Sequence, residues 1–347
     1  MSQRLVLHAD ADAFFASVVL RGRPDLIDTP VAVTAYVFVA SANYVARSRG
    51  VHGGMLAAEA LRLCPDLVLI EVPRSEVEEA SEALFDLFAD CALAVEPGSM
   101  EEGFLDVGVT DWSAAREAAE VIRHRAAGEL SLPISIGIGR TKLIAKLASR
   151  SAKPDGVRMI EPAEEQILRA TLRLDRAWGV GGRTLERLTQ LGAVTLGDLD
   201  TVSDDELELV CGVGMAKRLR GFRTGTDDSE VRSVATRTTL SSEGAIAGFR
   251  RPDHLPADVL TGSVARVCRR AIRAGLVGTG MTLTLKPTAG GPPLVRRQSF
   301  PDPSADVELW SDRARMLLAD LPHPELSGIG FTLTRLQPAT DVPATLF

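Results

Sequence analysis

The chain has 347 residues, of which 45% are hydrophobic and 24% are charged, and its formal net charge is −7. This length exceeds what one ordinary hydrophobic core organises, so two or more domains are expected. No apolar run approaches the roughly 18 residues of a membrane span, and the N-terminus lacks the basic and long apolar segments of a signal peptide. A membrane protein and a secreted protein are both disfavoured.

The cysteines also argue against a secreted protein. The four of them, Cys64, Cys91, Cys211 and Cys268, are far apart and form no C-x-x-C pair. This spacing argues against a disulfide framework and against a zinc site. A reducing cytoplasm is the simplest setting for free thiols, so we expect a cytoplasmic protein.

In the N-terminal third, the pattern of apolar residues predicts alternating strands and helices. Residues 4–9 predict a buried strand followed by the start of a helix, and residues 30–43 predict two short strands around a turn. A helix follows from Asn43, and two further helices are predicted over residues 55–65 and 75–92.

The stretch "PGSMEEGFLDVGV", residues 97–109, places two glutamates side by side before an apolar run. Adjacent side chains of an extended segment point to opposite faces. The stretch is either a charged turn leading into a strand or a carboxylate pair that holds a metal at a strand end. Alone, it favours the first interpretation.

An amphipathic helix from Asp111 and a strand over residues 133–139 come next. The order strand–helix–strand–strand–helix–strand is typical of a ferredoxin-like sheet. We expect that sheet to consist of residues 4–9, 67–71, 93–108 and 134–138.

From residue 163 the chain changes to short helices around glycine turns. The G-V-G turns at residues 179–181 and 212–214 each precede a basic helix. A glycine-rich turn that opens a helix exposes backbone N–H groups to phosphate, as in helix–hairpin–helix elements that hold a DNA backbone. The alternative is a pair of helix caps in a small bundle.

The remaining residues predict a second α+β domain. A polar connector over residues 227–239 leads to a basic helix at 259–275 and to Arg-rich strands at 280–287, 294–300 and 328–336.

The charge is distributed unevenly along the chain. Residues 1–110 carry 7 Arg and no Lys against 17 acidic residues, whereas residues 231–347 carry 14 basic and 10 acidic residues. Between them, residues 139–158 hold six basic side chains against Asp155 alone. A polyanion along the C-terminal half and cations in the N-terminal part would fit, although a basic helix face is more often simply solvated.

Four segments in order carry a family resemblance: "HADADAFFASV", "ASANYVAR", "SMEEGFLD" and "ISIGIGRTKLIAKLASRSAKPDG". Their sequence and spacing resemble those of Y-family DNA polymerases of the DinB, or polymerase IV, type, and the similarity extends over essentially the whole chain. The resemblance implies an α+β multidomain fold with a ferredoxin-like palm, fingers, a helix–hairpin–helix thumb and an α+β little finger. The expected parts are the palm (1–9 and 74–162), fingers (10–73), thumb (163–230), linker (231–235), little finger (236–337) and C-terminal tail (338–347).

The implied activity is template-directed addition of deoxynucleotides to a primer end, with low processivity, as translesion synthesis. The implied partners are primer-template DNA and dNTPs, and the implied state is a monomer. Two Mg²⁺ ions, with Mn²⁺ as a substitute, would activate the primer hydroxyl and neutralise developing charge. Such hard ions prefer oxygen ligands, which accounts for the carboxylates.

The resemblance also assigns roles to individual residues. Asp10 and Glu101 would bind both metals, Glu102 the catalytic metal, and the Ala11 carbonyl the nucleotide-side ion. Asp12 would support the site without being a ligand.

The nucleotide would be held by residues from the fingers and the palm. Tyr44 and Arg47, three apart on a helix, would contact the triphosphate, together with Lys153 and Ser41. Phe15 would be the steric gate against a ribose 2′ oxygen, with Phe14 packed beside it. DNA contacts are expected from Lys142, Lys146, Gly179, Gly181, Gly212, Gly214, Arg296 and Arg297.

Several positions depart from the family pattern. Glu101 stands where the family usually has Asp, and Val19, Val45 and Thr141 replace residues that are common there. Two functions therefore remain: an active translesion polymerase, or a divergent, catalytically weak member that serves as a DNA-binding or scaffold subunit of a mutagenic complex. The retained carboxylates and triphosphate residues favour the enzyme.

The last two residues, Leu346 and Phe347, resemble the end of the sliding-clamp peptide of bacterial polymerases. Pro343 and Ala344 differ from the Gln and Leu of that peptide. The tail is either a clamp-binding peptide or a frayed terminus with two incidental apolar residues.

Overall fold

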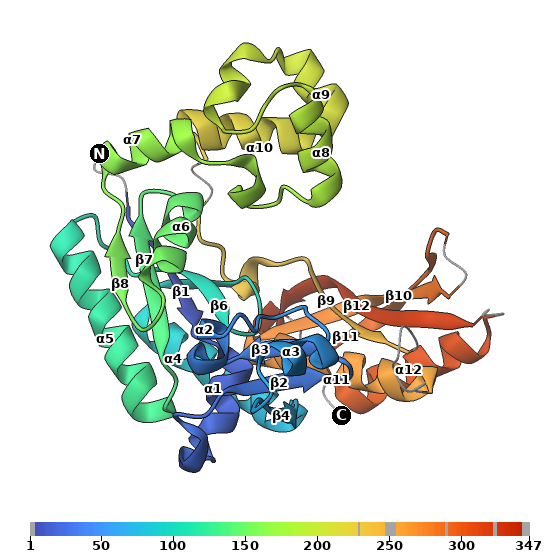
Figure 1. Ribbon diagram of the computed structural model, residues 1–347. Coiled ribbons are helices and arrows are strands. Elements are labelled where there is room, and N and C mark those ends of the chain that lie inside the picture. The colour runs from blue at the N-terminus through green and yellow to red at the C-terminus, as the bar shows by residue number, and fades with distance from the viewer. Residues whose placement is uncertain (1–3, 228–229, 247–254, 289–290, 322–324, 342–347) are drawn as a thin grey trace. The chain divides into compact units, whose positions relative to one another are not determined.

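The computed structural model describes residues 4–227, 230–246, 255–288, 291–321 and 325–341 (Figure 1). The chain forms two compact units, Met1–Arg232 and Ser233–Phe347. The division falls inside the connector predicted at residues 231–235. Leu346 and Phe347 lie outside the described residues. No described helix combines the length and apolar character that crossing a bilayer would demand.

A five-stranded sheet forms the centre of the first unit. Its strand order is β5 (Ala94–Pro97), β6 (Glu102–Asp106), β1 (Val6–Ala11), β7 (Ile134–Gly139) and β8 (Val157–Met159). β1 is antiparallel to both of its neighbours, and β7 is parallel to β8. Helices α4 (Arg74–Cys91) and α5 (Trp112–Leu130) pack on one face, where alternate residues of β1, such as Leu7 and Ala9, join the core.

The expected ferredoxin-like order is present in β1, α4, β5, β6, α5 and β7. The placement of residues 67–71 in this sheet was wrong. β4 (Val68–Glu71) instead pairs in parallel with β2 (Val31–Ala35), which also pairs with β3 (Phe38–Ala42) in a separate three-stranded sheet. An apolar run predicts a strand but does not specify its partner, because pairing depends on contacts between distant segments.

The segment between β1 and α4 forms the fingers, with helices α1 (Phe14–Arg21), α2 (Tyr44–Ser48) and α3 (Ala57–Leu63) around the three-stranded sheet. α2 begins after Asn43, whose side-chain oxygen accepts a hydrogen bond from the Ala46 N–H at 2.9 Å. β1 continues to Ala11, two residues past the predicted end of the first palm segment at residue 9. The domain boundaries themselves stay predictions.

Helix α6 (Lys142–Ala152) lies against the face of the palm sheet opposite α4 and α5. Two glycines of β7 make this contact possible. A Cβ at Gly137 would lie 2.0 Å from the Ser149 nitrogen, and one at Gly139 would lie 2.8 Å from the Ala145 nitrogen. The backbone of α6 therefore rests directly on the strand, and its side chains are held close to β1.

Helices α7 (Pro162–Thr171), α8 (Gly182–Gln190), α9 (Asp204–Cys211) and α10 (Val213–Thr224) form the thumb, and α8, α9 and α10 pack around an apolar core that also includes Leu143 of α6. α8 begins directly after the first glycine turn. α10 begins at Val213, so Gly214 lies inside its first turn and not before the helix.

The second unit is an antiparallel sheet in the order β11 (Leu294–Ser304), β10 (Leu276–Pro287), β12 (Leu326–Pro338) and β9 (Thr239–Ala245). Helices α11 (Pro256–Arg273) and α12 (Val307–Ala319) cover one face around the buried Trp310. β9 and α12 were not predicted. β9 was missed because its outward positions are Thr, Ser and Glu, which leaves Leu240 as its one fully buried apolar side chain.

Candidate active site

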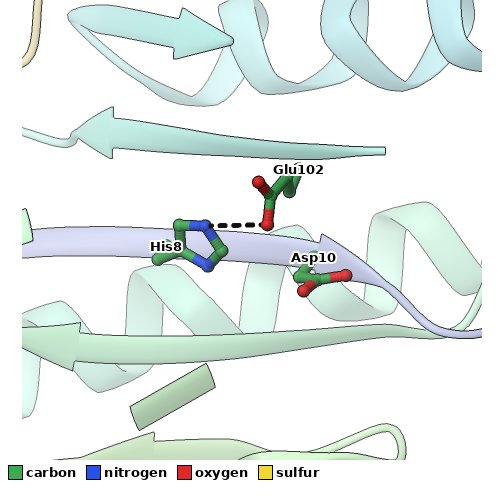
Figure 2. Close-up of side chains that lie close together, drawn as sticks. All are labelled: His8, Asp10 and Glu102. Atoms are coloured by element: carbon green, nitrogen blue, oxygen red, sulfur yellow. Dashed lines mark ion pairs between the residues drawn. The ribbon is translucent and has the colours of Figure 1, made fainter. Parts of the chain in front are cut away.

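Two carboxylates face each other across neighbouring strands of the palm sheet. Asp10 in β1 is the direct register partner of Glu102 in β6, and His8 precedes Asp10 on the same face. One ligand atom from each of these three side chains lies within 4.8 Å of the others. Figure 2 shows Glu102 directed toward His8, with Asp10 beside them. The glutamate stretch is thus more than a solvated turn.

Glu101 lies in the bend before β6 and differs from its neighbour. Its carbonyl oxygen accepts a hydrogen bond from the Ala11 N–H at 2.9 Å, so its backbone is tied to the end of β1. Burial raises the pKa of the Glu101 carboxyl, and the nearby charges of Asp10 and Glu102 raise it further. Glu101 is therefore the carboxylate whose charge is least compensated.

The charge of the Glu102 carboxylate is well compensated, because a lysine of α6 pairs with it. The Lys146 Nζ lies 2.5 Å from the Glu102 Oε2, and the His8 Nε2 lies 3.5 Å from the same oxygen. The hydrogen bond with His8 and the Lys146 ammonium hold the pKa of Glu102 at about 2, although burial opposes them.

His8 was missed in the sequence, although the two-residue spacing to Asp10 indicates a shared face. Its Nδ1 lies 2.7 Å from the Ser149 Oγ. A neutral imidazole that carries its proton on Nε2 donates to the Glu102 Oε2 and accepts at Nδ1 from the Ser149 hydroxyl. Burial lowers the pKa of His8. At neutral pH the imidazole is thus uncharged, and Lys146 supplies the positive charge beside Glu102.

The Asp10 carboxylate is paired from the other side of the site. The Lys153 Nζ lies 2.6 Å from the Asp10 Oδ1 and 3.3 Å from the Asp12 Oδ1. Asp12 is fully buried and accepts hydrogen bonds from the Ser135 Oγ at 2.8 Å and the Asp155 N–H at 2.7 Å. Asp12 thus binds the segment that carries Lys153.

The predicted triphosphate residues lie on the same side. The Tyr44 hydroxyl donates to the Asp12 Oδ1 at 3.1 Å, and burial raises the Tyr44 pKa. The Arg47 guanidinium carbon lies 5.0 Å from the Tyr44 ring centroid. Asp12 therefore contacts both Tyr44 and Lys153, and Lys153 in turn pairs with Asp10. Ser41 lies nearly buried in β3.

The two phenylalanines differ in position, although their ring centroids are only 5.7 Å apart. Phe14 belongs to the palm core and is 4% exposed. Phe15 is half-buried at the edge of that core. Phe15 is therefore the ring that presents surface at the edge of the palm core, and its role as a steric gate stays a prediction.

Two residues predicted to contact DNA are turned inward. Lys142 and Lys146 are 5% and 7% exposed. The Lys142 Nζ pairs with the Glu96 Oε2 at 2.6 Å, and Lys146 pairs with Glu102. A direct contact with DNA would need these ion pairs to open. Their contact with DNA stays a prediction.

The glycine turns of the thumb are accessible. A Cβ at Gly181, Gly212 or Gly214 would meet no atom within 4 Å, so a polyanion backbone has room to approach these turns. Gly179 has φ +93°, and a Cβ there would lie 2.8 Å from the Arg218 Nη1. A side chain at position 179 would therefore be strained and crowded.

The two arginines predicted on the second unit lie on opposite faces of β11. Arg297 is the register partner of Thr282, whereas Arg296 is the partner of the buried Leu283. Arg297 therefore belongs to the face that no described helix of this unit covers.

The donor set suits a hard divalent cation. Asp10 and Glu102 offer carboxylate oxygens within 4.8 Å of one another, and Glu101 adds a third carboxylate, whose charge is only partly compensated. Oxygen donors of this kind match Mg²⁺ and Mn²⁺. His8 lies within the same distance, but its Nδ1 is engaged by Ser149 and its ring is buried.

Comparison with known proteins identifies the family of the chain. Residues 9–150 match the profile described as the impB/mucB/samB family, and residues 256–346 match the C-terminal domain of that family. A protein named DNA polymerase IV 2 from Mesorhizobium japonicum is 32% identical over 350 residues, which cover 98% of this chain and 83% of that protein. A DNA polymerase IV from Pseudomonas putida is 38% identical over 251 residues, 70% of each chain.

Solved structures share the fold. An insertion ternary complex of Dbh DNA polymerase gives a TM-score of 0.74 at 22% identity, over 96% of this chain and 99% of that one. The crystal structure of DinB from Sulfolobus solfataricus gives a TM-score of 0.70 at 23% identity, with the same coverage.

The palm sheet with its carboxylates, the thumb and the C-terminal α+β unit define a Y-family DNA polymerase fold. Within that class, the chain belongs to the impB/mucB/samB family and is of the DinB type, whose curated members cited above are named DNA polymerase IV.

Proposed function

We propose that this protein is a template-directed DNA polymerase that adds deoxynucleotides to a primer 3′ end in low-processivity translesion synthesis. The observation that carries the proposal is the cross-strand pair Asp10–Glu102 at the strand ends, with Glu101 beside it, in a chain of this family. Primer-template DNA and dNTPs are the substrates, and two Mg²⁺ ions are the cofactors, with Mn²⁺ as a substitute.

Bound divalent ions would activate the primer hydroxyl and neutralise charge on the phosphates. Asp10, Glu101 and Glu102 would hold them, with the Ala11 carbonyl as a further oxygen donor. In this chain, Lys146 keeps the Glu102 carboxylate ionised and oriented, and Asp12 positions the segment that carries Lys153.

The side chains around Asp12 would hold the incoming nucleotide. Tyr44, Arg47 and Lys153 bring hydroxyl and cationic groups to the side of the site next to Asp10, where a triphosphate would find donors. Phe15 would fill the space that a ribose 2′ oxygen needs. This arrangement orients the α-phosphate for attack and favours the deoxy sugar.

DNA would contact the glycine turns of the thumb and the uncovered sheet face of the second unit. The open approach to Gly181, Gly212 and Gly214 supports the first contact, and the exposed Arg297 supports the second. We propose that the protein works as a monomer in the cytoplasm, a compartment in which the four cysteines would stay free thiols.

A primer-extension assay with Mg²⁺ and, separately, Mn²⁺ tests this function. The wild-type protein should extend a primer on a template, and Asp10→Asn should not, while both bind the DNA with similar affinity. A wild-type protein that binds DNA but adds no nucleotide with either ion would overturn the proposal in favour of a DNA-binding or scaffold subunit.

A further inference from the structure

A tryptophan of the thumb reaches the palm next to the carboxylates. Trp178 directly precedes the first glycine turn, and its ring centroid lies 5.4 Å from that of Phe104 in β6. Two cations flank the indole: the Lys146 Nζ lies 5.9 Å from its centroid, and the Arg218 Cζ of α10 lies 5.5 Å away. Both distances are within the range of a cation–π contact.

The same lysine belongs to the carboxylate site. The Lys146 Nζ that lies over Trp178 also makes the 2.5 Å ion pair with Glu102. Phe104 is two residues beyond Glu102 on the same face of β6, and its ring packs 4.7 Å from that of His8. One ammonium group is thus shared between a thumb aromatic ring and a palm carboxylate.

The two contacts of the Lys146 ammonium depend on each other because this side chain is buried and has little room to move. Lys146 is 7% exposed, so solvent cannot replace a lost partner at low cost. Removing the indole would leave a void and admit water beside the ammonium, and the lysine would then hold the Glu102 carboxylate less firmly. The backbone of α6 cannot adjust, because it rests on Gly137 and Gly139.

We propose that Trp178 is a positioning residue that couples the thumb turn at residues 179–181 to the orientation of the Glu102 carboxylate through Lys146. The inference rests on the proposed function, in which that turn holds the DNA backbone and Glu102 holds metal. A thumb seated on DNA keeps Trp178 against Phe104 and Lys146, and so keeps Glu102 ready for catalysis.

The emission of Trp178 tests the coupling without any catalysis. The chain has three tryptophans, so the difference between each variant and its Trp178→Phe derivative isolates Trp178. Glu102→Gln should shift this difference spectrum, because the released Lys146 changes its contact with the ring. Glu101→Gln is the matched control and should not shift it, because the Lys146 ammonium pairs with the Glu102 carboxylate. An equal response to both variants, or none to Glu102→Gln, would overturn the proposal.

Kinetics provide a second test. Trp178→Ala should lower the extension rate at saturating DNA about tenfold, the size of a buried cation–π contact with its packing, and Trp178→Phe should restore most of it. In a double-mutant cycle with Lys146→Met, the combined variant should be no slower than the slower single variant. Additive losses, or a loss confined to DNA affinity, would mean that Trp178 only stabilises the thumb.

These outcomes separate the two proposals. If the wild-type protein extends primers and the losses of the variants are additive, the proposed function stands and the proposed coupling is wrong. A wild-type protein without extension loses the proposed function, and the fluorescence comparison still decides whether Trp178 and Glu102 are linked.

Discussion

The palm sheet and the sheet of the second unit are each covered by two helices on one face, and they differ in the side chains of the other face. Each packs two helices on one side, α4 and α5 in the palm and α11 and α12 in the second unit. The other face of the palm carries Asp10 and Glu102 under α6, paired with lysines. The corresponding face of the second unit carries half-exposed threonines and Arg297.

The contrast shows that the function of each sheet comes from its second face and not from its backbone plan. Partly buried carboxylates beside the buried Lys146 and the half-buried Lys153 interact strongly and can hold ions in fixed positions. Hydroxyl groups and an exposed arginine suit weaker contacts with a polyanion that do not depend on sequence. Palm variants should therefore change the reaction rate, and variants of the second unit should change DNA affinity.

The largest effect is expected in the palm. Glu101→Ala and Glu102→Ala should each lower primer extension by at least about a thousandfold, because a metal ligand is lost. DNA affinity, measured by fluorescence anisotropy, should stay nearly unchanged. Glu101→Asp should remain active, because it keeps the carboxylate on a shorter arm. Retained activity in both alanine variants would contradict the site assignment.

The adjacent glutamates should affect stability in opposite directions. The depressed pKa of Glu102 stabilises the fold above the ordinary carboxyl pKa and ceases to do so as the pH falls toward 2, so Glu102→Gln should cost up to about 3 kcal/mol at pH 7. The raised pKa of Glu101 means that its ionised form costs stability at pH 7. Glu101→Gln should therefore stabilise the protein at pH 7 and much less near pH 4. Urea unfolding at both pH values measures these differences, and shifts of equal sign would contradict the assignment.

Sugar choice tests the edge of the palm core. Phe15→Ala should open space beside β1 and raise ribonucleotide incorporation relative to deoxynucleotide incorporation by roughly tenfold or more. Single-nucleotide insertion with dNTP and rNTP of the same base gives the ratio. A wild-type protein that accepts both sugars equally would show that Phe15 is not the gate.

A smaller effect is expected on the second unit. Arg297→Ala should weaken DNA binding a few-fold and reduce the salt dependence of log Kd by about 1, as loss of one phosphate contact predicts. Arg296→Ala is the matched control, because Arg296 is the neighbouring residue and belongs to the helix-covered face of the sheet. The rate at saturating DNA should be unchanged in both. Equal losses in the two variants would contradict the assignment of faces.

The smallest effect concerns the C-terminal residues. If Leu346 and Phe347 bind a sliding clamp, deleting them should reduce clamp-stimulated synthesis and leave extension by the enzyme alone unchanged. Equal stimulation with and without these residues would mean that they are an ordinary terminus.

Patterns within one segment predicted much of this structure. The alternation of "LVLHADA" places Asp10 on the face opposite Leu7 and Ala9, and the order of elements predicts the ferredoxin-like palm. The G-V-G turns predicted two helix starts, of which the second begins two residues early, at Val213. These features depend on neighbours within a few residues, which a sequence displays directly.

Contacts between distant segments could not be predicted in the same way. Lys142 and Lys146 look like a solvated basic face, but the contact of α6 with β7 turns them toward Glu96 and Glu102. β8 has only three residues, too few for a periodic signal. Trp178 follows a loop, and nothing in its neighbourhood indicates that its partner is Phe104, which is 74 positions earlier.

The glycines of β7 have a consequence for how the site moves. Because α6 touches the strand backbone at Gly137 and Gly139, with no side chain between them, the helix and the sheet should fluctuate together as one body. The separation between the α6 backbone, which carries Lys146, and the palm sheet is then little affected by slower movements of the fingers loops. Gly137 and Gly139 thus help to keep the distance between the Lys146 ammonium and the Glu102 carboxylate constant, although neither glycine lines the site.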